Sequence, residues 1–349
     1  MNPAKPLEML RHPIIQGPMA GGFCTPALIA AVGDAGGLGS LAGSLLTPAA
    51  LREQVAQIRA LTSAPFLINF FVQQTPSPSD AELAAAVELL RPVWQQLGWT
   101  DLPRPAQWCQ DFNVQFETLL SLKPAFASFT FDILTAEQVE RLHGAGIAVI
   151  GTVTTVDEAL AWQAIGADAV IASGVEAGGH RGTFIGRQEE ATLGGRALWP
   201  QVAAAVDIPV IAAGNIMDGA DIAAALAAGA VAVQMGTAFL VTDEAAVHPA
   251  YKAQLLSGTV STRLTRAFSG RYARGIENTF MRQMAGVEAQ VPAYPVQNAL
   301  TGSIRAAAAA ANNPELMSLW AGTGVNRARA MPAAQLVATL AAELAAVQQ

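Results

Sequence analysis

The stretch DAVIASGVEAGGHRG, residues 168–182, joins a short apolar run to a glycine-rich loop that carries a histidine. The run 168–172 is partly β-branched and follows an Ile-Gly-Ala segment, so it predicts a parallel strand entered from a helix. Parallel sheets bind ligands at the carboxyl ends of their strands, where His180 comes. Gly178 and Gly179 lack a Cβ, so their N–H groups can approach a ligand on a flexible hinge. The alternative is a capping loop whose histidine meets only solvent or carbonyls, and the rest of the chain decides between the two.

A unit recurs along the chain in which a helix closes on Ala-Gly or Gly-Ala and a short apolar strand follows, as at residues 34–39, 144–150, 165–170 and 228–233. Each glycine can end its helix in the left-handed conformation before the next strand. Repeated units of this kind predict a parallel sheet with right-handed crossovers. We expect eight strands, which predicts an α/β fold of the TIM (β/α)8 barrel type rather than an open sheet. They are residues 14–18, 38–41, 66–71, 126–129, 148–152, 169–172, 210–213 and 232–235.

The composition agrees with a large buried sheet and limits the classes of partner that we expect. The chain has 349 residues, of which 52% are hydrophobic and 13% charged, enough for one barrel with additions or for two ordinary domains. A net charge of −7 offers no basic surface for a polyanion, so nucleic acid is not an expected partner. Cys24 and Cys109 are too few for a disulfide framework and lack metal-ligand spacing. We expect buried structural thiols and no metal.

Neither targeting nor membrane insertion is indicated. Residues 1–11 lack a charged-then-apolar signal pattern, so a cytoplasmic location is expected. Residues 222–241 are uncharged and long enough to span a bilayer. Half of them are alanine or glycine rather than leucine or phenylalanine, they include Gln234 and Thr237, and the pattern changes from helix to strand at Gly229. These features argue against a membrane span.

The strand and helix alternation defines the expected domains. We assign residues 1–240 to the barrel core, with a helical insertion near 75–123 where prolines and tryptophans interrupt the pattern. Residues 241–331 predict a smaller, mainly helical domain of helices and loops at the barrel mouth. Residues 332–349 predict a C-terminal alanine-leucine helix that packs rather than binds.

The last two barrel strands predict a phosphate site. In barrels, the loops after strands seven and eight bind phosphate through free N–H groups and a helix N-terminus. Gly214, Gly236 and Thr237 fit this role, although each glycine alone could be an ordinary turn residue. No Walker pattern exists, and residues 37–42 only imitate a dinucleotide fingerprint because they fall within an expected strand.

Two further segments suit a flat ring. Residues 16–22, QGPMAGG, form a turn of small residues against which a ring could lie, and this turn includes Pro18, Met19 and Ala20. Asn69 ends the third strand as a buried amide between apolar neighbours and must find hydrogen-bond partners. A planar heterocycle would satisfy it, and a structural core amide is the competing explanation.

Several motifs together resemble the nitronate monooxygenases, formerly called 2-nitropropane dioxygenases, and in particular their class I branch. The motifs are HPIIQGPMAG at 12–21, EAGGHRG at 176–182, QMGT at 234–237, TRAFSGR at 265–271 and YPVQN at 294–298. The resemblance runs from His12 to the carboxyl terminus. It implies an FMN-bearing TIM barrel with a smaller helical domain, acting on a small anionic nitronate and O₂. The activity implied is oxidation of alkyl nitronates to a carbonyl compound and nitrite, beginning with single-electron transfer from the substrate, with nitroalkanes as a further substrate class.

The resemblance also implies roles for individual residues. His180 matches the active-site histidine, and an imidazole with a pKa near 6.5 suits proton transfer or substrate orientation. The flavin would carry the redox chemistry. The predicted cofactor contacts are Pro18, Met19, Ala20, Asn69, Gly178, Gly179, Gly214, Gln234, Met235, Gly236 and Thr237.

Three positions depart from the family pattern, and two alternatives stay open. Asn215 stands where a second glycine is usual, Thr323 where glutamine is usual, and Asp132 where glycine follows the phenylalanine. Asparagine tolerates left-handed geometry, whereas a carboxylate at the mouth would repel an anionic nitronate. A flavin-dependent NAD(P)H reductase of quinones or enoyl thioesters is one alternative function. A flavin-binding protein without turnover is the other, and the sequence does not fix the oligomeric state.

Overall fold

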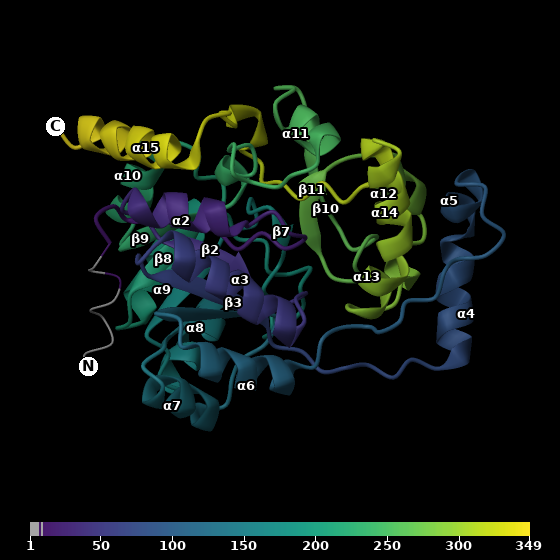
Figure 1. The fold of residues 1–349 in the computed structure, drawn as a ribbon, viewed down its shortest axis with the longest axis horizontal. Coiled ribbons are helices and arrows are strands. Elements are labelled where there is room, and N and C mark those ends of the chain that lie inside the picture. The colour runs from purple at the N-terminus through teal and green to yellow at the C-terminus, as the bar shows by residue number, and fades with distance from the viewer. Residues whose placement is uncertain (1–6, 8–9) are drawn as a thin grey trace.

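A parallel sheet of eight strands curls into a nearly closed barrel with helices outside it (Figure 1). The computed structural model describes residue 7 and residues 10–349. The sheet order is β1-β9-β8-β6-β5-β4-β3-β2, with every pairing parallel. The predicted TIM barrel is confirmed, and each expected strand is present within two residues of its expected bounds. The strands are β1 (Ile14–Gln16), β2 (Gly39–Ala42), β3 (Phe66–Phe71), β4 (Phe126–Thr130), β5 (Ala148–Val153), β6 (Ala169–Ser173), β8 (Val210–Ala213) and β9 (Ala232–Met235).

The helices between the strands begin at side-chain caps. Thr25, Thr47 and Asp218, for example, each accept a hydrogen bond from a first-turn N–H group, which satisfies a donor that the helix leaves free. Because helices cover the outside and side chains fill the inside, all five residues of β6 are buried. The helices are α2 (Pro26–Asp34), α3 (Pro48–Leu61), α6 (Phe112–Leu122), α7 (Ala136–Gly144), α8 (Val156–Ala164), α9 (Gly195–Ala205) and α10 (Gly219–Ala227).

The barrel closes between β1 and β2 through a thin seam. The bridge Ile15↔Leu38 joins the two strands, with Gln16 N donating to Leu38 O at 2.9 Å. One step further, the side-chain Oε1 of Gln16 accepts a hydrogen bond from Ser40 N at 2.9 Å. A side chain therefore replaces the next backbone bond of the ladder.

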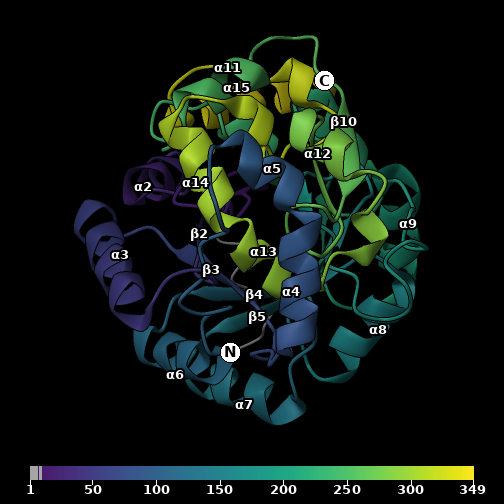
Figure 2. The ribbon, with the colours of Figure 1, turned by 90° about the vertical axis from the view of Figure 1, so that its right-hand side faces the viewer.

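The insertion after β3 carries α4 (Asp80–Leu89) and α5 (Arg91–Gln96) away from the barrel. Figure 2 shows both helices in front of α13 (Val296–Leu300) and α14 (Gly302–Ala310), which belong to the region after the barrel. The expected insertion of residues 75–123 also takes in α6, which packs against α3 as a barrel helix.

The region after β9 contains a small sheet that the sequence did not predict. Strands β10 (Thr262–Thr265) and β11 (Ala273–Ile276) pair antiparallel, and β11 also pairs with β7 (Gly179–His180). The expectation of helices and loops alone was wrong here, because TRLT and ARGI carry charges and a glycine rather than an apolar alternation. The helices of this region are α11 (Pro249–Leu255), α12 (Thr279–Met284), α13 and α14.

The C-terminal helix α15 (Ala333–Val347) packs on α10 and α2. Its Glu343 accepts a hydrogen bond from Gly219 N at 2.9 Å and pairs with Arg329 at 2.5 Å. The membrane-like stretch 222–241 is divided between α10 and β9. Among the described residues, no helix is long and apolar enough to cross a bilayer.

Candidate active site

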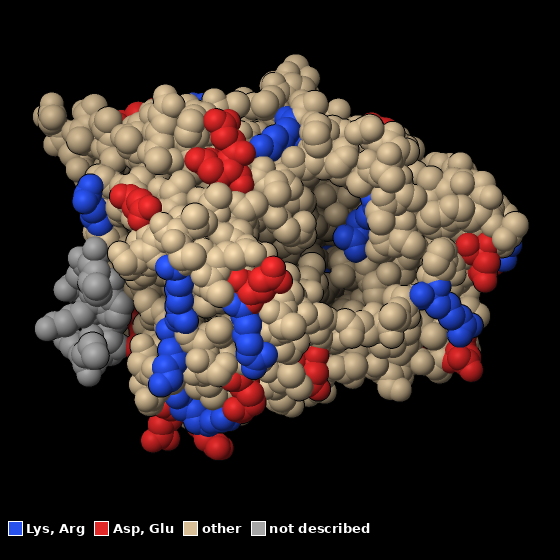
Figure 3. Space-filling model, viewed as in Figure 1, with Lys and Arg blue, Asp and Glu red and all other residues tan. Residues whose placement is uncertain are grey.

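A cavity of about 620 Å³ lies at the carboxyl ends of the barrel strands. Figure 3 shows the molecule hollowed between the barrel and the region after it, with a basic side chain inside the hollow. The barrel forms one wall, and residues of α13, α14 and the segment 317–324 form the other. The volume falls in the range of small-molecule and cofactor sites. The lining includes His180 and every residue for which the sequence predicts cofactor contact, so the structure brings them together, while their roles stay predictions.

His180 is held in one tautomer. Its Nε2 lies 2.8 Å from Ser269 Oγ. The single hydroxyl proton of Ser269 is donated to Arg271 O at 3.0 Å, so Ser269 accepts from His180 and Nε2 carries the hydrogen. The Nδ1 lone pair is therefore left free as an acceptor or base. Pairing of β7 with β11, which sets His180 opposite Ala273, fixes the backbone of the histidine.

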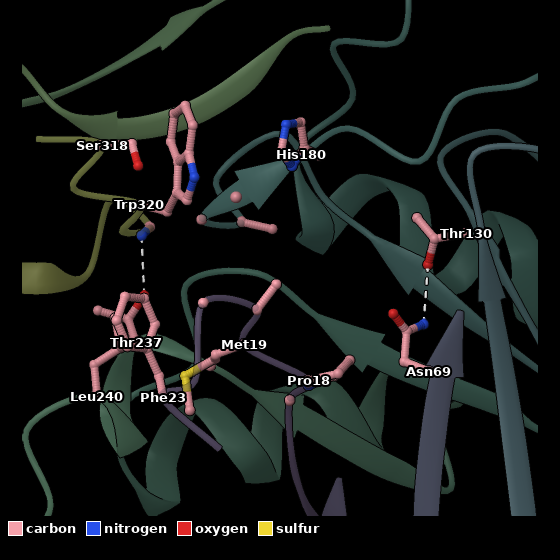
Figure 4. A pocket seen from close by; sticks show the side chains of 18 of the residues that line it. Pro18, Met19, Phe23, Asn69, Thr130, His180, Thr237, Leu240, Ser318 and Trp320 are labelled. Carbon is pink, nitrogen blue, oxygen red and sulfur yellow. Dashed lines mark hydrogen bonds between the residues drawn. The ribbon is translucent and has the colours of Figure 1, made fainter. Parts of the chain in front are cut away.

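Aromatic rings surround the imidazole. The ring centroids of Phe131, Tyr294 and Trp320 lie 5.4, 5.5 and 5.5 Å from that of His180, and Phe71 stacks on Phe131 at 4.1 Å. In Figure 4, His180 and Trp320 lie across the cavity from Pro18, Met19 and Asn69. Burial among these rings, with smaller effects of two arginines, lowers the pKa of His180 from 6.5 to about 3. The imidazole is therefore neutral at physiological pH.

This shift makes stability depend on pH in a defined window. Between pH 6.5 and 3 the unfolded chain protonates His180 and the folded protein does not, so acidification favours unfolding. We expect His180→Asn to lose less stability than the wild type on acidification, by on the order of 2 kcal/mol near pH 4.5. Melting temperatures of both proteins near pH 7 and near pH 4.5 test this. A difference between them that does not change with pH would contradict the assigned shift.

The loop that carries His180 is restrained, which corrects the expectation of a flexible hinge. Arg181 is buried and donates to Ser173 O at 3.0 Å and to Gly174 O at 2.7 Å. Arg271 donates to Arg181 O at 2.9 Å, and its guanidinium carbon lies 4.2 Å from the Phe131 ring centroid. A Cβ on Gly178 would come within 2.5 Å of Gly322 N, so this glycine serves close packing.

Asn69 lies two residues before the carboxyl end of β3 and is buried. Its Nδ2 donates to Ser128 Oγ at 2.9 Å, to Ser128 O at 3.2 Å and to Thr130 Oγ1 at 3.3 Å (Figure 4). These contacts fix the amide plane and use its nitrogen, while its oxygen is available to a ligand.

The loops after β8 and β9, where the sequence predicts a phosphate site, both line the cavity. Gly214 has φ +110° and Asn215 has φ +54°, so asparagine adopts the left-handed geometry expected of it. The Asn215 side chain turns to Arg327, whose Nη2 lies 3.1 Å from Oδ1. At Gly236, an added Cβ would meet nothing within 4 Å. Thr237 Oγ1 accepts a hydrogen bond from Gly322 N at 3.0 Å, which ties the loop to the opposite wall (Figure 4).

The cavity also offers a buried polar group and space that would suit a flavin ring. Gln234 Oε1 is buried without a hydrogen-bond partner and would accept from a ring N–H group. The small residues 17–21 leave room for a ring against main chain, and Met19 N is tied to Cys24 Sγ at 3.0 Å. Burial raises the pKa of Cys24 to about 11, so it stays a thiol. Cys24 is buried as expected, whereas Cys109 is only partly buried; both are free cysteines.

Comparison with known proteins identifies the family. The family model described as nitronate monooxygenase matches residues 5–343. The chain belongs to this family.

Relatives from the nitronate monooxygenase family match this chain along nearly its whole length. A probable nitronate monooxygenase of Bacillus subtilis is 42% identical over 321 residues, covering 90% of this chain and 91% of the relative. One of Staphylococcus haemolyticus is 39% identical over 331 residues, covering 94% and 92%. A solved structure of nitroalkane oxidase from Streptomyces ansochromogenes has a TM-score of 0.91 at 42% identity, covering 98% of each chain. The structure of FabK from Thermotoga maritima has a TM-score of 0.76 at 29% identity, covering 98% and 96%. The chain is therefore an oxidoreductase of the nitronate monooxygenase family.

Two departures from the family pattern lie outside the cavity. Asp132 is exposed, and its carboxylate accepts a hydrogen bond from Ile133 N at 2.8 Å. It is absent from the described lining of the cavity, and the expected repulsion of an anionic substrate by Asp132 stays a prediction. Thr323 is also exposed, and its N–H group donates to Glu176 O at 3.0 Å.

Sequence reasoning missed part of the nitronate monooxygenase site. Tyr294, Arg305 and Trp320 line the cavity from the region after the barrel, and Ser269 orients His180 from the loop before β11. Two of them, Ser269 and Tyr294, lie in motifs that carried the family resemblance, which was the signal available. Arg305 lies in an alanine-rich helix that reads as a surface helix.

Proposed function

We propose that this enzyme binds FMN and oxidises alkyl nitronates with O₂ to carbonyl compounds and nitrite. The proposal rests on the family and on one observation, a neutral His180 with a free Nδ1 in a cavity that fits a flavin. Two nitronates and one O₂ give two carbonyl groups and two nitrite ions, which balances atoms and charge. A bound flavin supplies the electron transfer that this oxidation requires.

In this proposal, the residues of the protein bind the flavin, orient the substrate and shield it from water. Gly214, Gly236 and the 234–237 backbone would hold the phosphate end, and Asn69 and Gln234 would meet the ring. The rings of Phe131, Tyr294 and Trp320 would exclude water from the substrate. His180 Nδ1 would accept a hydrogen bond or a proton at the substrate carbon, with Ser269 as the positioning residue.

Anaerobic mixing tests the proposed reaction. We expect a nitronate to reduce the bound flavin rapidly, with loss of its absorbance, and NADH to reduce it slowly or not at all. Readmission of O₂ should then restore the absorbance, with nitrite measured in the product. Rapid bleaching by NADH together with no effect of the nitronate would replace this function by that of an NAD(P)H reductase. No bleaching by either would favour a flavin-binding protein without turnover.

A further inference from the structure

Arg305 of α14 has no acidic partner. Its Nη2 donates to Asn298 O at 2.7 Å and to Asn298 Oδ1 at 3.1 Å. Its Nε is buried without a hydrogen-bond partner. Within the part of the chain that the structure describes, no carboxylate forms an ion pair with it. A partly buried guanidinium without a counter-charge is unfavourable, and an anion from solution would relieve this cost.

The cavity is otherwise uncharged. Among its described lining residues, Arg305 is the one Asp, Glu, Lys or Arg side chain. No carboxylate therefore competes for the guanidinium from the cavity wall, and an anion entering the cavity meets a single fixed positive charge. In this low-dielectric setting the attraction is much stronger than in water.

Arg305 lies at the substrate end of the cavity rather than at the phosphate end. Arg305 and Tyr294 both line the cavity from the region after the barrel, and the Tyr294 ring centroid lies 5.5 Å from that of His180. The expected phosphate loops at Gly214 and Gly236 belong to β8 and β9 of the barrel. The anion that Arg305 would meet is thus the one that also meets His180.

The wall around Arg305 is small and apolar. Gly302, Ala306 and Ala309 come from the same helix and line the same cavity, and Met317 lies beside them in the lining. An added Cβ at Gly302 would meet nothing within 4 Å, so there is open space at this position of the wall. A compact anion with a short alkyl part suits this wall.

We propose that Arg305 recognises the negative charge of the substrate and makes the site select a preformed nitronate over the neutral nitroalkane of the same shape. The inference rests on the proposed function and assigns its charge selectivity to one residue. Guanidinium is suited to this because its planar fork matches two oxygens bound to one atom, as in a nitronate. The neutral nitroalkane has the same two oxygens but no net charge, so the guanidinium contributes far less to its binding free energy.

The test uses the holoenzyme and an inert anion of the same geometry. We would measure nitrate binding by its perturbation of flavin absorbance, and KM for a nitronate and its neutral nitroalkane. Arg305→Met removes the charge and Arg305→Lys keeps it. Arg263→Met is the matched control, since Arg263 is a partly buried arginine with an unpartnered Nε outside the cavity lining.

We expect Arg305→Met to weaken nitrate binding and raise the nitronate KM by on the order of 10- to 100-fold. The neutral nitroalkane KM should change less than about 3-fold, Arg305→Lys should recover most of the loss, and Arg263→Met should match the wild type. Flavin content and melting temperature should not fall in Arg305→Met, because the variant removes an unpaired buried charge.

Unchanged nitrate affinity in Arg305→Met would overturn the inference. So would equal losses for the anion and the neutral compound, or loss of flavin, which would assign Arg305 to shape or to the cofactor. The nitrate measurement separates this inference from the proposed function. If the wild type oxidises no nitronate while nitrate binding still depends on Arg305, the function fails and the anion site stands.

Discussion

His180→Asn should abolish turnover of a neutral nitroalkane and leave oxidation of the preformed nitronate largely intact. A carbon acid must lose a proton before it can be oxidised, whereas the nitronate has already lost it, so only the first needs a base at His180 Nδ1. Loss of a general base lowers rates by about 10²- to 10⁴-fold. Because the pKa of His180 is lowered to about 3, it is a weak base, and the wild type should already favour nitronates. Initial rates with each substrate at equal flavin content measure the effect.

His143→Asn is the matched control for this variant. His143 pairs with Asp168 at 2.9 Å at the start of β6, the end of the barrel opposite the cavity. The His143→Asn variant should oxidise the nitronate and the neutral nitroalkane at the rates of the wild type. Equal loss with both substrates in His180→Asn would assign His180 to positioning of the substrate, and unchanged rates with both would remove it from the reaction.

Gly236→Asp should give a protein that folds without its flavin. The backbone at Gly236 has φ −100° and ψ −65°, which any residue adopts, and an added Cβ has open space. The side chain therefore enters the cavity without disturbing the fold, and its carboxylate would face the phosphate. Two charges about 4 Å apart repel by about 4 kcal/mol at an effective dielectric of 20, enough to lower flavin affinity by more than about 100-fold.

The wild type sets the reference for this comparison. We expect it to be isolated yellow, with one FMN per chain, and Gly236→Asn to retain more flavin than Gly236→Asp because it has the same size without the charge. Flavin-to-protein ratios, FMN titration and melting temperature of the flavin-free proteins measure each part. Similar losses for Asp and Asn would mean that the loop holds no phosphate. FAD as the released cofactor, or a wild type that binds no flavin, would contradict the cofactor assignment.

Gly214 is a less informative position for the same test. It has φ +110°, and a Cβ there would lie 3.3 Å from Ala177 N. Any side chain would strain the backbone, so loss of flavin would not separate charge from misfolding.

The barrel could be predicted from the sequence because its signals are local. The strands are short apolar runs, several of which follow a glycine able to cap a helix, and the bounds of β3 and β9 matched the expected residues. The small sheet could not be predicted, because β7 has two residues and its partner β11 lies more than ninety positions away in the chain. Such pairing depends on tertiary contacts rather than on local pattern.

The same reasoning explains which site residues were found. Asn69, Gly214 and Gln234 could be inferred because a parallel barrel sets the ends of its strands around one mouth. Arg305 could not be inferred, because nothing in a run of alanines tells whether its charge faces water or a cavity. Asp132 could be placed just past the fourth strand, but the hydrogen bond that its side chain accepts from Ile133 N could not be inferred.

The seam between β1 and β2 is held by fewer hydrogen bonds than the other strand pairs of the barrel. Elsewhere the strands are joined by ladders of backbone bonds, but here a bridge and the Gln16 side chain hold the cylinder shut. The turn at residues 17–21, which lines the cavity, begins directly after Gln16. A flavin bound against this turn would contact the closed form of the seam. Closure of the barrel and binding of the cofactor would therefore be thermodynamically linked. We therefore expect β1 and β2 to separate locally more often in the flavin-free protein than in the flavin-bound protein.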